Sequence, residues 1–326
     1  MLIQDCIILC SFICLMLIVN LSRKDKRPIV YDSFDKGTAF REIGRYDSAY
    51  YHFNQARKYA EEKADLRINA EALLEMASLL YITNNFIESE KNALEAVKIA
   101  QATGFKDLEY VGLANLAMLS TDEKDYSTGI RYNKRALEIL DNHYFPEEFL
   151  FRETTLNNLG VTFQSQGDDN QALKVFDIAL SNPIVKQDRK LYAMLLDNQA
   201  YSNFKIGNRR SVGDSMNKAL GLRRSIRDVP GEIINLIHLS EYNRIYGDFR
   251  NAFYLINRAY TSARKFKLPA ERMLCLQELI KVDPPNQQKY IQEYIKISDS
   301  LKIVERRNHN KFARIAFETD EIIKQK

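Results

Sequence analysis

The sequence predicts an all-α solenoid of antiparallel helix pairs, followed by a long C-terminal helix. Three observations predict this class: a recurring turn residue, an alanine column twelve positions after it, and a column of small residues seven positions before it. A period between about 20 and 50 residues is the signature of a repeat array. The turn residues are spaced 40, 40, 43, 40 and 40 residues apart and are Gly44, Asn84, Lys124, Gly167, Gly207 and Gly247.

Both columns beside the turns consist almost entirely of glycine and alanine. A small residue midway along each helix lets the paired helix approach closely, and each pair hides its apolar stripe only by stacking on its neighbours. We therefore expect these columns to be packing positions. After the turns they are Ala56, Ala96, Ala136, Ala179, Ala219 and Ala259, and before the turns they are Gly37, Ala77, Ala117, Gly160, Ala200 and Ser240.

Composition favours helices and argues against several function classes. The 326 residues include only 12 glycines and 7 prolines, fewer than many short strands would require. The net charge of +4 comes from interspersed lysines, arginines and acids, so no nucleic-acid partner is expected. The four histidines have no partner at metal-ligand spacing, and neither a glycine-rich phosphate loop nor a catalytic nucleophile motif is present. We therefore expect no enzymatic activity, cofactor or metal.

The stretch ETTLNNLGVTFQSQGDDNQALKVFDIAL at residues 153–180 resembles the tetratricopeptide repeat family. That resemblance implies a right-handed superhelix of six repeats from about Tyr31 to Lys267, with a seventh first helix at Ala270–Val282. Gly129 and Val212 depart from the pattern, where the family has alanine. The spacing exceeds the usual period of about 34 residues, as in longer-repeat members that bind peptides. The matching residues are Leu156, Leu159, Gly160, Phe163, Gly167, Ala172, Phe176 and Ala179.

In the resembled family, the first helices line a concave groove, which identifies candidate peptide-binding residues. An asparagine amide offers donors and an acceptor, so a row of asparagines can pair with the backbone of an extended peptide. The alternative is that these amides bond to helix ends or across the seam between repeats. Lysines and arginines are sparse along the predicted groove, which favours a mostly neutral peptide. The candidates are Asn115, Asn157, Asn158, Gln164, Asp197, Asn198, Tyr201, Phe204, His238 and Arg244.

The N-terminal residues 1–27 form an apolar segment followed by a basic flank. The run Cys6–Leu21 is shorter than the roughly 20 residues of a spanning helix, so a signal peptide, a signal anchor and a lipoprotein signal compete. We expect export with membrane retention through residues 3–21 and periplasmic repeats. The basic Arg23 and Lys24 argue instead that this flank is cytoplasmic.

The C-terminal segment 286–326 contains no glycine or proline and predicts one long helix after a repeat domain at 28–282. We expect this helix to cap the last repeat and to transmit a shift. The stretch DSLKIVERRNHNKFARIAFETDEI resembles the exit segment of Bacteroidetes membrane sensors, in which a histidine kinase or a helix-turn-helix regulator follows. The sequence thus predicts a peptide- or protein-binding module that is the sensory part of a bacterial membrane signalling system. The alternatives are a free-standing adaptor or scaffold, and a truncated sensor histidine kinase lacking its catalytic core.

Overall fold

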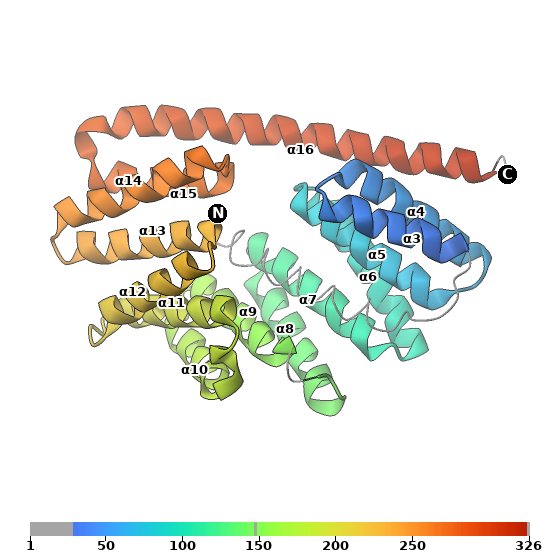
Figure 1. Cartoon of the computed structure of the whole chain (residues 1–326), viewed down its shortest axis with the longest axis horizontal. Coiled ribbons are helices and arrows are strands. Elements are labelled where there is room, and N and C mark those ends of the chain that lie inside the picture. Colours follow the sequence, from blue (N-terminus) through green and yellow to red (C-terminus); the bar gives the residue numbers. More distant parts are fainter. Residues whose placement is uncertain (1–28, 147–148, 325–326) are drawn as a thin grey trace. The chain divides into compact units, whose positions relative to one another are not determined.

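A computed structural model describes residues 29–146 and 149–324 (Figure 1). Its helices follow one another along the chain, separated by short turns. They are α3 (Ile29–Glu42), α4 (Tyr46–Glu62), α5 (Leu66–Ile82), α6 (Phe86–Thr103), α7 (Lys106–Asp122), α8 (Tyr126–Asn142), α9 (Phe151–Gln166), α10 (Asp169–Ser181), α11 (Arg189–Lys205), α12 (Val212–Ser225), α13 (Val229–Ile245), α14 (Phe249–Lys265), α15 (Pro269–Val282) and α16 (Gln287–Lys324), with short 3-10 helices η2 (Pro183–Lys186) and η3 (Pro284–Asn286).

The predicted all-α solenoid of helix pairs is confirmed. Regular structure in the described ranges is helical throughout, without a strand. Consecutive helices pack as pairs, for example α3 with α4, α5 with α6, and α13 with α14, and the first helices α9, α11, α13 and α15 also contact their neighbours. The described residues form two compact units, one comprising Ser120–Asn133 and Phe145–Leu301 and the other comprising 29–119, Lys134–Tyr144 and 302–324.

Every turn residue that the repeat period singles out adopts a left-handed backbone. Gly167, for example, has φ of 88° and ends α9, and even Asn84 and Lys124 have φ of 61° and 66°. The following helix is often capped by an aspartate: the Asp168 carboxylate accepts from the backbone N–H of Gln171. Such a cap satisfies one of the donors that the start of a helix leaves unpaired. The turn residue and the cap together fix where one helix ends and the next begins.

We expect opposite effects from two glycine-to-alanine substitutions. Gly167→Ala places a Cβ in a left-handed turn and should destabilise the protein by about 1 kcal/mol. Gly221 lies within α12, where an added Cβ meets no neighbouring atom within 4 Å. Gly221→Ala should therefore stabilise by about 0.5–1 kcal/mol, because alanine loses less backbone entropy in a helix. Urea unfolding followed by circular dichroism checks both, and equal shifts would contradict this account of the turn.

The small-residue columns lie at the closest contacts between helices. A Cβ built on Gly160 of α9 would lie 2.3 Å from the ring of Phe176 on α10, and one on Gly37 would lie 2.7 Å from Phe53. The alanines of the second helices, Ala56, Ala96, Ala136, Ala179, Ala219 and Ala259, are completely buried, and Ala77, Ala117 and Ala200 of the first helices are almost as buried.

The C-terminal helix α16 is a single helix, as the sequence predicts, and its two parts belong to different units. Near its start, the Tyr260 hydroxyl of α14 donates to the Glu293 carboxylate over 2.7 Å, and Arg272 of α15 also donates to Glu293. The seventh first helix is α15, one residue longer than its predicted range. The proposed domain boundaries at 28–282 and 286–326 stay a prediction.

The prediction of a membrane-associated protein with periplasmic repeats is corrected by the structure. Across residues 29–146 and 149–324, no helix has the length and the apolar character that crossing a bilayer requires. The long helix α16 fails because charged residues recur along it. The apolar segment at residues 3–21, on which the prediction rested, lies outside the described residues.

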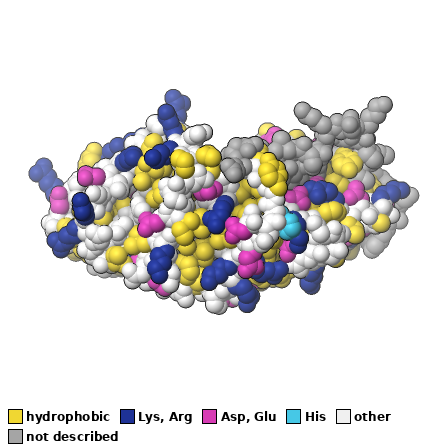
Figure 2. Space-filling view, turned by 90° about the horizontal axis from the view of Figure 1, so that it is seen from below, with side chains coloured by type: hydrophobic (Ala, Val, Ile, Leu, Met, Phe, Trp, Pro, Cys, Tyr) yellow, Lys and Arg dark blue, Asp and Glu magenta, His cyan; other side chains and the backbone are white. Residues whose placement is uncertain are grey.

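Charged side chains of both signs are interspersed on the face that Figure 2 shows. Lysines, arginines and acidic residues alternate there with apolar side chains, without a continuous stripe of one sign. Nucleic-acid binding usually leaves an electrostatic footprint of clustered Lys and Arg. This face offers no such footprint.

Candidate functional site

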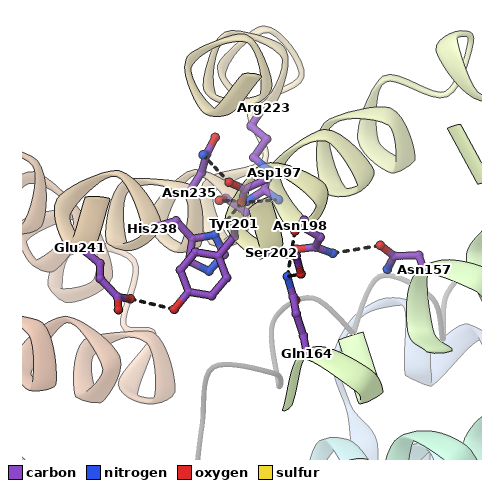
Figure 3. A network of polar contacts seen from close by, with 11 residues as sticks. Asn157, Gln164, Asp197, Asn198, Tyr201, Ser202, Arg223, Asn235, His238 and Glu241 are labelled. Atoms are coloured by element: carbon purple, nitrogen blue, oxygen red, sulfur yellow. Dashed lines mark hydrogen bonds and ion pairs between the residues drawn. The ribbon is translucent and has the colours of Figure 1, made fainter. Parts of the chain in front are cut away.

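Polar and aromatic side chains from three consecutive first helices, with one arginine from a second helix, form a connected band within one unit (Figure 3). We call this set the polar band. It links α9 to α11 and α11 to α13 by hydrogen bonds between side chains. Its members are Asn157 and Gln164 of α9, Asp197, Asn198, Tyr201 and Ser202 of α11, Arg223 of α12, and Asn235, His238 and Glu241 of α13.

The repeat period and helix geometry explain why these side chains meet. Asn158, Asn198 and His238 occupy the same position of successive repeats, with Asn157 and Asp197 directly before two of them. Side chains three and four residues apart share a helix face. Tyr201 therefore lies on the same face of α11 as Asn198 and Asp197. Stacked repeats bring equivalent positions together, so one face of α11 contacts both neighbouring first helices.

Asparagine and glutamine amides carry the contact between α9 and α11. The Asn198 side-chain N–H donates to Asn157 Oδ1 over 2.9 Å, and Gln164 Nε2 donates to the Asn198 carbonyl and to Ser202 Oγ, both over 2.8 Å. Asn157 Nδ2 and Asn198 Oδ1 are buried and have no hydrogen-bond partner among the described residues. One donor and one acceptor are thus left unpaired, which is the complement of a single peptide group.

A buried charge cluster carries the contact between α11 and α13. The Asp197 carboxylate accepts from Asn235 Nδ2 over 2.7 Å and from His238 Nδ1 over 3.2 Å, and forms an ion pair with Arg223 of α12 at 3.3 Å. Arg223 also donates to the Gly231 carbonyl. All four side chains are buried. Buried charges must be paired and hydrogen-bonded. Asp197 and Arg223 pair with each other across helices, while Arg223 Nε and Asn235 Oδ1 have no hydrogen-bond partner among the described residues.

Tyr201 forms the half-buried edge of the polar band. Its ring stacks on His238 with centroids 4.0 Å apart, and its hydroxyl donates to Glu241 Oε2 over 2.7 Å. Burial and the neighbouring Glu241 carboxylate raise the pKa of Tyr201 well above its ordinary value. Burial alone would raise the pKa of Glu241, but the Tyr201 hydrogen bond and the Lys205 charge outweigh it and lower that pKa. At neutral pH the pair is a neutral donor and an ionised acceptor.

Three other predicted groove residues, Asn115, Asn158 and Phe204, are not members of the band. Asn115 is buried on α7 with an amide that has no partner among the described residues, but it belongs to the other compact unit. Asn158 is buried, and its carbonyl accepts from the Thr162 hydroxyl. Phe204 is buried beside the rings of Tyr242 and Tyr246.

Arg244 continues the contacts between first helices beyond the band. Its Nε donates to the Glu278 carboxylate of α15 over 2.7 Å, so this predicted groove cation is already paired. Sequence reasoning missed Arg223, Asn235, Glu241 and Glu278. Glu241 lies forty residues after Tyr201 in the sequence, so the repeat period could have identified Glu241 as a site residue.

The residues of the band do not form a metal site. Within residues 29–146 and 149–324, no group of three or more His, Cys, Asp and Glu side chains is arranged to hold a metal ion. The nearest approach to such a group, Asp197 with His238, is completed by the Arg223 guanidinium and by Asn235 Nδ2, which are hydrogen-bond donors and do not ligate a metal.

No protein-family model and no curated protein matches the chain. Solved structures do. The apo form of RapI superposes with a TM-score of 0.67 at 17% identity, covering 91% of this chain and 99% of that one. The Rap conjugation gene regulator of plasmid pLS20, in complex with the Phr* peptide, superposes with a TM-score of 0.64 at 12% identity, covering 84% of this chain and 75% of that one. Aspartyl phosphate phosphatase F from Bacillus subtilis superposes with a TM-score of 0.64 at 18% identity, covering 84% of this chain and 70% of that one. The chain therefore has a tetratricopeptide-type fold like that of the Rap proteins.

Proposed function

We propose that this chain is a peptide- or protein-binding module whose ligand contacts the polar band of α9, α11 and α13. The observation that supports this most is the pair of unpaired atoms at Asn157 and Asn198, a buried donor beside a buried acceptor. An unsatisfied buried polar group costs about 1–3 kcal/mol. Both side chains are fully buried in the chain, so a peptide group gains affinity from the two atoms by entering the seam between α9 and α11.

The chemistry of the band favours an extended and mostly neutral ligand. The charged groups in and beside the band are paired with one another: Arg223 with Asp197, Lys205 with Glu241, and Arg244 with Glu278. The half-buried groups at its edge are the Gln164 amide and the Tyr201 ring. Amide hydrogen bonding and an aromatic surface recognise a peptide backbone and an apolar side chain better than a charged terminus.

Similar structures support the class of ligand. The pLS20 regulator, which shares the fold, was solved with the Phr* peptide. A signalling role, with an output domain of the histidine-kinase or helix-turn-helix class, is a further prediction from the sequence resemblance that the binding proposal does not require. Phosphatase activity is named for one similar protein, but the polar band contains no arrangement from which we derive catalysis.

The proposal predicts that Tyr201→Ala weakens peptide binding at least tenfold. Heptapeptides selected from a displayed random library on the wild-type protein serve as probes, and their affinity is measured by fluorescence anisotropy. A tenfold loss corresponds to about 1.4 kcal/mol, a reasonable value for a lost aromatic contact and hydrogen bond.

Tyr192→Ala is the matched control. Tyr192 lies on the same helix α11 but is not part of the band, and its hydroxyl accepts a hydrogen bond from Lys218 of α12. Circular dichroism establishes that both variants keep their helices. Failure to enrich any heptapeptide over a blank surface would contradict the proposal, as would equal affinity for wild type and Tyr201→Ala.

A further inference from the structure

The outward face of α14 presents aromatic side chains to solvent. Its opposite face is completely buried through Ala252, Ile256, Ala259 and Ala263, which pack toward the neighbouring helices α13 and α15. On the outward face, by contrast, Phe249, Phe253 and Tyr254 are 55%, 39% and 58% exposed. Exposed aromatic side chains gathered on one face are typical of interaction sites.

The same face of α14 is cationic. The helix contains Arg250, Arg258, Arg264 and Lys265 and no acidic residue. Arg258 lies 3.4 Å from the Glu232 carboxylate, but that carboxylate is also paired with Arg224 at 2.8 Å, so two cations share one anion. Arg250 forms no ion pair with any residue in the described part of the chain. Arginine and aromatic residues together are the combination that dominates binding hot spots.

The repeat period identifies α4 as the equivalent of α14, with three charges reversed: Asp47 corresponds to Arg250, and Glu61 and Glu62 correspond to Arg264 and Lys265. Counting from the turn glycines Gly44 and Gly247, the third position is Asp47 in α4 and Arg250 in α14. The sixth position is aromatic in both helices, Tyr50 and Phe253, and the seventh is tyrosine in both. The two faces therefore share aromatic residues at the sixth and seventh positions and differ in the sign of the charge at the third position.

On α4 this face is covered by a helix. In the unit that contains both, the C-terminal part of α16 lies beside α4 (Figure 1). The rings of Tyr50 and Phe312 pack with centroids 4.8 Å apart, and Lys311 forms an ion pair with Asp47. Phe312 and Tyr50 are both buried by this contact. An aromatic residue at the sixth position and a charge at the third thus make a helix-docking face.

We propose that the outward face of α14 docks a helical segment of a protein partner in which an acidic residue is adjacent to an aromatic one. The segment is the charge-reversed counterpart of Lys311 and Phe312: its acid pairs with Arg250 and its ring packs on Phe253. A second copy of α16 does not satisfy this face in the same way, because Lys311 would meet Arg250 with like charge. The surface is separate from the polar band and does not depend on the proposed peptide ligand.

A charge-reversed peptide tests the proposal. The probe is a synthetic peptide of residues 302–320 carrying Arg306→Glu, Arg307→Glu, Lys311→Glu and Arg314→Glu, and the unmodified peptide is its control. Binding to the full chain is measured by calorimetry at low salt, since ion pairing at an exposed surface is screened by salt. We expect the probe to bind the wild type, and Arg250→Glu with Phe253→Ser to weaken it at least tenfold.

The matched control variant is Lys174→Glu, which reverses an exposed cation at the repeat position of α10 that corresponds to Tyr254 of α14. It should leave probe binding unchanged. The proposal is overturned if the probe does not bind, if Lys174→Glu weakens it as much, or if the unmodified peptide binds equally at α14. It is also overturned if Arg250→Glu with Phe253→Ser abolishes self-association in sedimentation or binding to anionic phosphatidylglycerol vesicles while leaving probe binding intact.

Discussion

Asp197→Ala is expected to destabilise the protein by about 3–5 kcal/mol, because it leaves Arg223 buried without its counter-charge. Arg223 is almost completely buried, and Asp197 is its ion-pair partner at 3.3 Å. The same change removes the acceptor for Asn235 and His238. The measurement is the shift of the urea unfolding transition, followed by circular dichroism.

Two further variants distinguish the buried charge from a general effect of substitution. Asp214→Ala removes an exposed carboxylate from α12 and should change stability by less than about 0.5 kcal/mol. Arg223→Met added to Asp197→Ala should recover part of the loss, because it removes the unpaired cation. A loss below about 1 kcal/mol for Asp197→Ala alone would mean that the cluster does not hold α11, α12 and α13 together.

Gly160→Leu is expected to cost on the order of 1–3 kcal/mol or more, the usual cost of overpacking a core. A Cβ alone would lie 2.3 Å from the Phe176 ring, and all three atoms nearest to it belong to that ring. The whole leucine side chain therefore forces α9 and α10 apart. Thermal unfolding measures the effect, and an unchanged melting temperature would contradict the close contact.

A second substitution identifies the contact partner. Phe176→Ala alone leaves a cavity and should destabilise by about 3–5 kcal/mol. In the double variant, which combines Gly160→Leu with Phe176→Ala, the new leucine side chain can occupy part of the cavity that the missing Phe176 ring leaves. The two losses should therefore be less than additive, as expected for residues in contact. Strict additivity would place Gly160 and Phe176 in independent environments.

The repeat period predicts the fold well because it reflects the local backbone conformation of the turns and the local packing at helix crossings. Gly167 and Lys124 differ chemically, yet both occupy left-handed turns that the period alone locates. Gly160 and Phe176 were both singled out by the resemblance, and the structure places one against the other. Turn conformation and small residues at helix crossings leave a direct trace in the sequence, so helix number and order can be derived from them.

The partners of the site residues were harder to predict. The sequence marks Asp197 as a groove candidate, but its contacts with Arg223, Asn235 and His238 depend on how three helices pack. The hypothesis that asparagines bond across the seam between repeats describes the Asn157–Asn198 contact, while the unpaired atoms of the same pair leave the peptide hypothesis open to test. Pairing across a seam is set by side-chain rotamers, which a periodic pattern does not encode.

The sequence also did not predict the contact between the C-terminal helix α16 and the N-terminal helix α4. The C-terminal helix was expected to cap the last repeat, and near Glu293 it does contact α14 and α15. Its later contact between Phe312 and Tyr50 joins residues more than 250 positions apart. Only the comparison of α4, which docks α16, with α14 suggests that the exposed face of α14 also docks a helix.

The most direct test of the proposed function is a crystal structure of the chain with a heptapeptide selected on it. The account predicts that the peptide backbone lies within hydrogen-bond distance of Asn157 Nδ2 and Asn198 Oδ1, with a side chain against Tyr201. A peptide bound instead to the second helices α10 or α12, with the polar band unchanged, would contradict it.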